Sequence, residues 1–336
     1  MQSPLRIVAL GGGTGLASLL RGLKRYSCLR PGIDDQPRVD ITAVVTVTDD
    51  GGSSGRLRRE FAMLPPGDIR NCMVALSEDE SLLASLFDYR FQAGRGLKGH
   101  SFGNLFLTAL THVSGDFLKA IQVSSEVLAI HGRIYPSTRR NVTLAAELSD
   151  GAVLAGESRI GRARQAIRRV WLDPKDCRPL PEVEEAIARA DLITLGPGSL
   201  FTSVIPNLLV RGIPRAIKQS RATKLYFANL MWQPWETMNF TAADHVAAIE
   251  QHAGRGLLDA VVVNTRHIGG ERRRRYAAQK VYPVQVDVPR LEQYGVEIIA
   301  RDLLAKTDMV RHDPDATAAV AVEQAQRARL RLLSGK

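Results

Sequence analysis

The chain has few cysteines, few aromatic residues and no long apolar run. Its cysteines are Cys28, Cys72 and Cys177, an odd and widely spaced set in 336 residues. This pattern argues against a disulfide framework or a zinc ribbon and favours structural thiols in a reducing compartment. No apolar run reaches the length of a membrane span, and no basic segment followed by an apolar stretch opens the sequence. We therefore expect a cytoplasmic protein without a membrane span.

Two nucleotide-binding fingerprints are also missing. In the loop Gly11-Gly12-Gly13-Thr14-Gly15, Leu16 stands where the dinucleotide motif G-x-G-x-x-G needs its last glycine. No Gly-Lys-Ser/Thr completes a Walker loop either. The acidic residue that follows the next apolar run, Asp49, lies well beyond the ~20 residues expected of an NAD site. NAD therefore stays an alternative that the spacing disfavours.

The same loop nevertheless has the composition of a phosphate-binding turn. It follows the apolar run 5–10, which predicts a strand, and precedes a helical pattern over 16–23. Glycines let the backbone approach a ligand, and a helix start offers unpaired N–H groups with partial positive charge. A tight turn without a ligand is the alternative. We expect a phosphate to bind Gly12, Gly13, Thr14 and Gly15.

A second small-residue loop follows the β-branched run 41–47, which predicts a buried parallel strand. Asp49 and Asp50 lie at the carboxyl end of this run, where open α/β sheets border their ligands. These carboxylates could hold a ribose hydroxyl, a metal ion such as Mg²⁺ or a reacting proton. The alternative is that Asp49 caps the next helix or turn. The adjoining residues that offer backbone donors are Gly51, Gly52 and Ser53.

A third loop repeats the arrangement of strand, small-residue turn and helix start. It follows the strand predicted at 191–195 and consists of Gly196, Pro197, Gly198 and Ser199. Two such cradles on one sheet suit a ligand with two separated anionic or polar ends. A later strand, predicted at 224–228, ends at Asn229 and is expected to reach the same crevice.

The remaining pattern predicts a large α/β core with additions. Helices are expected at 80–87, 104–112 and 182–189, and the glycine-rich segment 91–103 is predicted to be a mobile active-site loop. Within it, His100 is either a ligand contact or a solvent-facing residue. A β-hairpin over 142–156 interrupts the alternation of strands and helices. The expected division is a core at 1–133 and 181–310, an inserted subdomain at 134–180 and a helical tail at 311–336.

The charge is strongly positive, with a formal net charge of +10 and a pI near 9.8. Nucleic acid, a membrane surface and phosphorylated small molecules are all partners of such proteins. The arginine-rich segments, 133–178 and 272–275, are not interleaved with stacking aromatic residues. A solvated surface is therefore favoured over a nucleic-acid site.

Taken together, these motifs resemble the YvcK-type gluconeogenesis factors, relatives of the 2-phospho-L-lactate transferases in the CofD-like superfamily. The resemblance runs from Ile7 to about Val263 and includes the segments 9–16, 48–55, 67–72, 99–105, 190–210 and 229–231. Trp235 departs from it, because the family usually has Gly in Gln-Pro-Gly-Glu-Thr. That departure puts the geometry of this loop and any contact by Glu236 in question.

The resemblance implies a Rossmann-like, doubly wound fold and binding of a nucleotide sugar such as UDP-N-acetylglucosamine. It also implies a regulatory role in carbon flux and cell shape through an unidentified protein partner, without a tightly bound cofactor. The transferase branch instead moves a phospholactyl group with Mg²⁺, and Asp49 and Asp50 would then be catalytic or metal-binding. A homodimer stays open. The positions carried over by motif, in addition to those of the first two loops, are Asn71, Asn104, Gly196, Pro197, Gly198, Ser199, Thr202 and Ser203.

Overall fold

The computed structural model describes residues 3–28, 37–78 and 82–334. Within these ranges a seven-stranded sheet has the order β10-β9-β8-β7-β1-β2-β3, and every neighbouring pair is parallel. The strands are β1 (Leu5–Gly11), β2 (Val39–Val45), β3 (Arg133–Pro136), β7 (Leu192–Leu195), β8 (Thr223–Phe227), β9 (Ala260–Asn264) and β10 (Glu297–Arg301). The predicted α/β, Rossmann-like fold is therefore confirmed.

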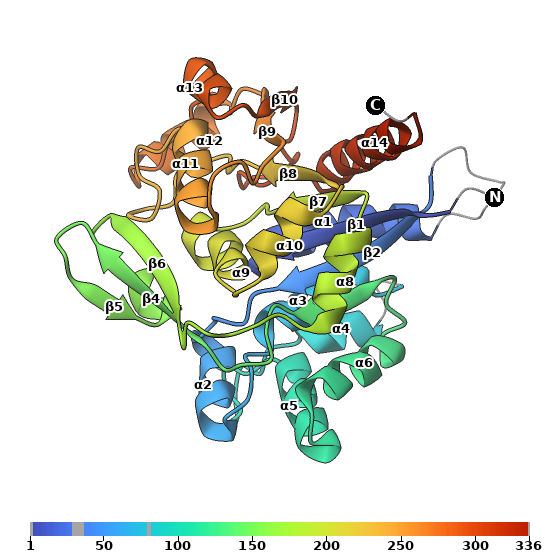
Figure 1. Cartoon of the computed structure of the whole chain (residues 1–336). Coiled ribbons are helices and arrows are strands. Elements are labelled where there is room, and N and C mark those ends of the chain that lie inside the picture. Colours follow the sequence, from blue (N-terminus) through green and yellow to red (C-terminus); the bar gives the residue numbers. More distant parts are fainter. Residues whose placement is uncertain (1–2, 29–36, 79–81, 335–336) are drawn as a thin grey trace.

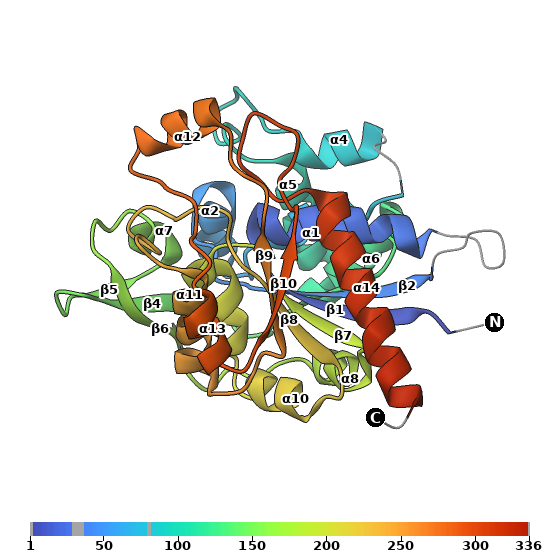
Figure 2. The same cartoon turned by 90° about the horizontal axis from the view of Figure 1, so that it is seen from above.

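Helices cover both faces of this sheet, so its central strands are apolar on both sides (Figures 1 and 2). One face is covered by α1 (Gly13–Ser27), α3 (Gly67–Leu76) and α14 (Pro314–Leu333). The other is covered by α8 (Pro181–Arg189), α9 (Ile205–Leu208), α10 (Ile213–Gln219) and α11 (Ala242–Ala253). The core is continuous through both layers.

The remaining elements lie at the periphery of the sheet. Several helices lie beyond β2 and β3, namely α2 (Gly52–Phe61), α4 (Leu82–Asp88), α5 (Phe102–Ser114) and α6 (Phe117–Val127) (Figure 1). The others are α7 (Glu157–Ile160), α12 (Gly270–Ala277) and α13 (Val288–Gln293). The π-helical turn η1 (Leu200–Val204) is not peripheral, because it is buried and contacts the central strand β1. The start of the helix predicted at 80–87 lies outside the described residues. No helix in the described part of the chain has both the length and the apolar character needed to cross a bilayer.

The predicted hairpin is present as β4 (Thr143–Leu148) and β5 (Val153–Ala155), and a third antiparallel strand, β6 (Ile167–Asp173), pairs with β4. This small sheet projects to one side of the molecule (Figure 1). The predicted inserted segment, 134–180, starts inside β3, which pairs with β2 in the main sheet. The division of the chain into domains stays a prediction.

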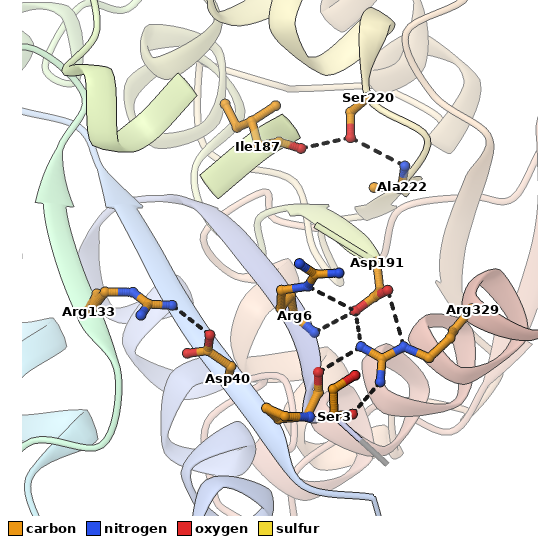
Figure 3. Close-up of polar contacts among 10 residues, drawn as sticks. Ser3, Arg6, Asp40, Arg133, Ile187, Asp191, Ser220, Ala222 and Arg329 are labelled. Atoms are coloured by element: carbon orange, nitrogen blue, oxygen red, sulfur yellow. Dashed lines mark hydrogen bonds and ion pairs between the residues drawn. The ribbon is translucent and has the colours of Figure 1, made fainter. Parts of the chain in front are cut away.

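The C-terminal helix is part of the core layer. Gly22 of α1 approaches α14 so closely that an added Cβ would lie 2.0 Å from the carbonyl oxygen of Pro314. At the far end of α14, the Arg329 guanidinium pairs with Asp191 and donates to the carbonyl oxygens of Ser3 and Pro4 (Figure 3). The apolar face of α14 is thus buried within this chain.

Candidate active site

The order of the strands in the sheet reverses between the parallel neighbours β1 and β7. The connection after β1 runs through α1 to β2, whereas the connection after β7 runs through α9 and α10 to β8 on the opposite side. In open α/β sheets, such a switch point leaves a crevice outside the carboxyl ends of the two strands. The first and third loops follow β1 and β7, so they lie on either side of this crevice.

A cavity of about 860 Å³ occupies this place, and we call it the main cleft. This volume lies within the usual range for small-molecule sites. The predicted site residues that line the main cleft are Gly12, Gly13, Thr14, Gly15, Asn71, Pro197, Gly198, Ser199, Thr202, Ser203 and Asn229. Those that do not line it are Asp49, Asp50, Gly51, Gly52, Ser53, Asn104 and Gly196.

The first and third loops touch each other. An added Cβ at Gly15 would lie 2.4 Å from the carbonyl oxygen of Pro197 and 2.8 Å from the Cα of Gly198. Only a glycine permits this approach, because real Cβ atoms do not come so close to backbone. Glycine at position 15 therefore lets the two loops come into contact beside the cleft that both of them line.

The first loop has free donors at the start of α1. The N–H of Gly13 is taken by the carboxylate of Asp68. Within the described residues, the N–H groups of Thr14 and Gly15 have no hydrogen-bond acceptor, as expected for a helix start. Thr14 is exposed toward the cleft. An anion at this place would gain both donors and the favourable end of the helix dipole.

Acidic side chains crowd the floor beside this loop. Burial, with the neighbouring Asp49 carboxylate, raises the pKa of Asp68 to about 6, although the bond from Gly13 opposes the rise. Burial, with the Asp68 and Asp49 carboxylates, raises the pKa of Glu157 well above its usual value. Glu157 lines the cleft and accepts a bond from the Thr48 hydroxyl (3.1 Å). Both carboxyl groups are thus suited to hold or exchange a proton near neutral pH.

The second loop uses its two aspartates to organise backbone. Asp49 Oδ1 accepts a bond from the N–H of Gly51 (2.9 Å), and Asp50 Oδ1 accepts one from the N–H of Ser158 (2.7 Å). Each carboxylate therefore keeps one oxygen for another partner. In the described part of the chain, no group of three or more His, Cys, Asp or Glu side chains is placed to bind a metal ion.

Behind the second loop, polar side chains form a buried network. The Ser53 hydroxyl lies 2.9 Å from Nδ1 of His100 and accepts a bond from the Asn104 amide (3.1 Å). His100 and Asn104 are both buried, and α5 begins at the cap residue Ser101. The solvent-facing alternative for His100 is therefore wrong, because the side chain is buried in this network. His100 does not line the main cleft, and its contact with a ligand stays a prediction.

The third loop differs from the first, because the protein fills it with its own carboxylate. Glu236 accepts bonds from the Ser199 hydroxyl and from the N–H groups of Phe201 (2.9 Å) and Thr202. Burial raises the pKa of Glu236, and these bonds oppose the rise. The backbone donors at the start of η1 are thus occupied. The remaining groups on this side, Ser203 and Asn229, are suited to hydroxyl and amide partners.

The loop that carries Glu236 has an unusual backbone. Trp235 has φ = 65° and Asn239 has φ = 65°, both in the left-handed region. This region suits glycine, the residue that the family resemblance implies at position 235. Trp235 is 40% exposed, and Trp232 packs edge-on against Tyr282 instead. The tryptophans and Tyr226 therefore do not form one aromatic cluster.

Several residues of the main cleft are absent from the predicted set. They are Arg21, Asp88, Glu157, Thr307, Arg311 and His312. Arg21 follows Thr14 and Ser18 at helical spacing, so the period of α1 would have placed it beside the loop. His312 lines the cleft, and its Nε2 donates to the carbonyl oxygen of Ala228, while burial lowers its pKa to about 4.

The fold and cleft define an α/β protein with a polar-lined cleft at its switch point. The sequence matches the family 2-phospho-L-lactate transferase CofD over residues 7–304, so the chain belongs to this family. It is 47% identical to the gluconeogenesis factor of Bacillus subtilis over 323 residues, covering 96% of this chain and 98% of that protein. It is 48% identical to the gluconeogenesis factor of Halalkalibacterium halodurans over 318 residues, covering 94% and 95%.

A solved structure confirms the same architecture. The crystal structure of a upf0052-family protein from Bacillus halodurans superposes with a TM-score of 0.90 at 46% sequence identity. The match covers 96% of this chain and all of that chain. The YvcK-type resemblance seen in the motifs is thereby confirmed.

Proposed function

We propose that the main cleft binds a nucleotide sugar such as UDP-N-acetylglucosamine. The observation that carries this proposal is the pair of free N–H donors at Thr14 and Gly15, at a switch-point cleft that Arg21 and Arg311 also line. A diphosphate matches two backbone donors flanked by guanidinium groups. Glu236 fills the third loop, so that side would receive the sugar or ribose hydroxyls through Ser203 and Asn229.

The names of the relatives support a regulatory role for this binding. Both compared relatives are named gluconeogenesis factor. We infer that the protein senses a nucleotide sugar and adjusts carbon metabolism and cell-envelope morphogenesis during gluconeogenic growth through a protein partner. In this role the bound ligand is a signal, and no bond in it needs to break.

Calorimetric titration with UDP-N-acetylglucosamine, with and without Mg²⁺, tests the binding step. A ligand present at about 100 times its dissociation constant should also raise the free energy of unfolding by about 2.7 kcal/mol. NAD serves as the comparison ligand and should produce no shift at the same concentration. Absence of heat and of thermal stabilisation with UDP-sugars would contradict the proposal.

A Mg²⁺-dependent transferase is the second candidate, because the family carries a transferase name and Glu157, whose pKa is raised, lines the cleft, with Asp68, whose pKa is also raised, buried beside Gly12. Asp49 and Asp50 each have one oxygen outside their hydrogen bonds to backbone N–H groups and would hold a Mg²⁺ only if a ligand phosphate reached them from the main cleft, which neither lines. When bound, Mg²⁺ would neutralise diphosphate charge. Asp68 or Glu157 would accept the proton of an attacking hydroxyl.

Turnover decides between the two candidates. ³¹P NMR of the protein with Mg²⁺, a phospholactyl nucleotide and an alcohol acceptor would show a new phosphodiester if the transferase candidate holds. Glu157→Gln should then abolish the signal while leaving nucleotide binding in place. Tight UDP-sugar binding without any turnover supports the regulator.

A further inference from the structure

A second cavity, of about 460 Å³, opens at the carboxyl ends of β8 and β9. Two valines, Val263 and Val284, form part of its apolar wall, and Trp232 and Tyr282 add aromatic surface. Their rings meet edge to face, with centroids 5.2 Å apart. The cavity therefore offers a wall suited to a flat ring.

The second cavity is separated from the main cleft by paired backbone. The segment that includes Leu230 and Trp232 lines both cavities. The N–H of Trp232 donates to the carbonyl oxygen of Tyr282 (2.9 Å), and the N–H of Val284 donates to that of Leu230 (3.1 Å). These bonds hold a short antiparallel partition between the two spaces.

Basic side chains line the second cavity without a neighbouring acid in its lining. Arg266, His267 and Arg273 belong to its wall, and the lining contains no Asp or Glu. Arg266 has an exposed partner in Asp302, at 3.3 Å. Neither His267 nor Arg273 forms an ion pair with any residue in the described ranges. A phosphate or carboxylate would complete this set of donors.

We propose that this cavity is a second ligand site, for a small molecule that joins a phosphate or carboxylate to a flat ring. The anionic group would lie against Arg273 and His267, and the ring against Trp232 and Tyr282. This proposal goes beyond nucleotide-sugar binding, because it concerns a separate space with its own charged wall.

Helix α12 links the second site to the main cleft. Arg273 faces the second cavity, whereas the preceding residue, Arg272, donates to the carbonyl oxygen of Thr307 (3.1 Å). The hydroxyl of Tyr276 accepts a bond from the N–H of Val310 (3.1 Å). Thr307 and Val310 line the main cleft. A ligand bound to Arg273 in the second cavity would therefore contact the same helix, α12, whose hydrogen bonds hold Thr307 and Val310 in the main cleft.

Titration calorimetry with AMP, which has one phosphate and one flat base, tests the site in the full chain. We expect Arg273→Gln to weaken AMP binding by about 10-fold or more, the usual effect of losing a charge-assisted hydrogen bond. The matched control is Arg274→Gln, on the same exposed helix but in neither cavity, and it should stay within about two-fold of the wild type. Arg21→Gln, in the main cleft, should leave the Arg273-dependent part of AMP binding unchanged.

Three outcomes would overturn the proposal: no AMP binding to the wild type, equal losses in Arg273→Gln and Arg274→Gln, or a loss only in Arg21→Gln. A competition titration adds a separate check. If UDP-N-acetylglucosamine binds in the main cleft and AMP binds in the second cavity, increasing AMP should shift the dissociation constant of UDP-N-acetylglucosamine only to a limiting value. A shift that grows without limit would place AMP in the main cleft and contradict a second site.

Discussion

The two ends of the parallel strands in the seven-stranded sheet differ in how their carboxylates are paired. We call the end where the strands begin the amino edge and the end where they finish the carboxyl edge. At the amino edge, Asp191 accepts bonds from the N–H of Arg6 (2.7 Å) and from the Arg329 guanidinium, and Arg133 pairs with Asp40 (2.6 Å) (Figure 3). At the carboxyl edge, Asp68, Glu157 and Glu236 are enclosed, and none has an ion pair with a described residue.

This difference indicates that the charged groups at the amino edge stabilise the fold, whereas those at the carboxyl edge serve ligand binding. The amino edge matches each of these carboxylates with a cation, so it stabilises the fold and offers little to a ligand. The carboxyl edge keeps carboxyl groups with raised pKa beside free N–H donors, a combination that costs stability and is typical of functional sites. Variants at the two edges should therefore change different measured quantities.

The largest expected effect lies at the amino edge. Arg329→Met leaves the carboxylate of Asp191, whose side chain is 5% exposed, without its main cation. Breaking a buried pair from one side should lower the free energy of unfolding by about 3 kcal/mol. Arg327→Met, which removes only an exposed pair with Glu323, should cost less than about 1 kcal/mol. Equal denaturant midpoints for the two variants would break the comparison.

The next effect lies in the main cleft. Arg21→Gln should weaken UDP-N-acetylglucosamine binding by about 10-fold, because a charge-assisted contact to the diphosphate is lost. Its free energy of unfolding should not change, since Arg21 is exposed. Arg25→Gln, one turn further along α1 and outside the cleft, is the control for calorimetry. A similar loss of affinity in both variants would contradict this placement of the diphosphate.

A smaller effect concerns pH. The pKa of Asp68 is raised from 3.8 to about 6, so the folded state binds the proton more tightly and loses stability as pH rises through that interval. Asp68→Asn should therefore raise the free energy of unfolding at pH 7 by about 1–2 kcal/mol. Asn can still accept the bond from Gly13.

The same experiment separates Asp68 from His312. The pKa of His312 is lowered from 6.5 to about 4, so its contribution has the opposite sign: stability falls as pH drops from 6.5 toward 4. Urea unfolding between pH 4 and 7 should show that the Asp68→Asn variant gains stability with pH more steeply than the wild type. Parallel pH curves for the two proteins would rule out a titrating Asp68.

The smallest expected effect is at Trp235. Replacing it with Gly relieves the strain of a left-handed backbone but increases the conformational entropy of the unfolded chain. We therefore expect the free energy of unfolding to rise by at most about 1 kcal/mol. Asn239 has the same left-handed conformation, which Asn tolerates better than Trp. Asn239→Gly should therefore raise the free energy of unfolding by less. Thermal unfolding measures both. A larger gain at Asn239 than at Trp235 would show that strain is not the dominant factor.

The sequence predicted the elements with strong local signals. Runs of buried apolar residues identified β1 and β2, and glycine content located the three loops. β10 was missed because only Ile299 of its residues is buried, which leaves no apolar run. β6 was missed because Arg168 and Arg169 interrupt its alternation, and the register shifts where β4 faces it.

The site was predicted less completely for a physical reason. A glycine loop can be recognised from a few consecutive residues, but the side chains that contact the loop in the folded protein come from distant segments of the sequence. Glu236 reaches the third loop from the segment after β8, and Glu157 enters the cleft from the start of α7, which follows the small antiparallel strand β5. No local pattern marks either contact. The third loop therefore seemed a second anion cradle, although its donors are already occupied.

A crystal structure of the protein soaked with UDP-N-acetylglucosamine and Mg²⁺ tests the central claim most directly. The account predicts the diphosphate within hydrogen-bonding distance of the Thr14 and Gly15 N–H groups, with hydroxyls toward Ser203 and Asn229 and Glu236 still bound to the third loop. A diphosphate held by the third loop in place of Glu236, or a main cleft without the ligand at saturating concentration, would contradict it.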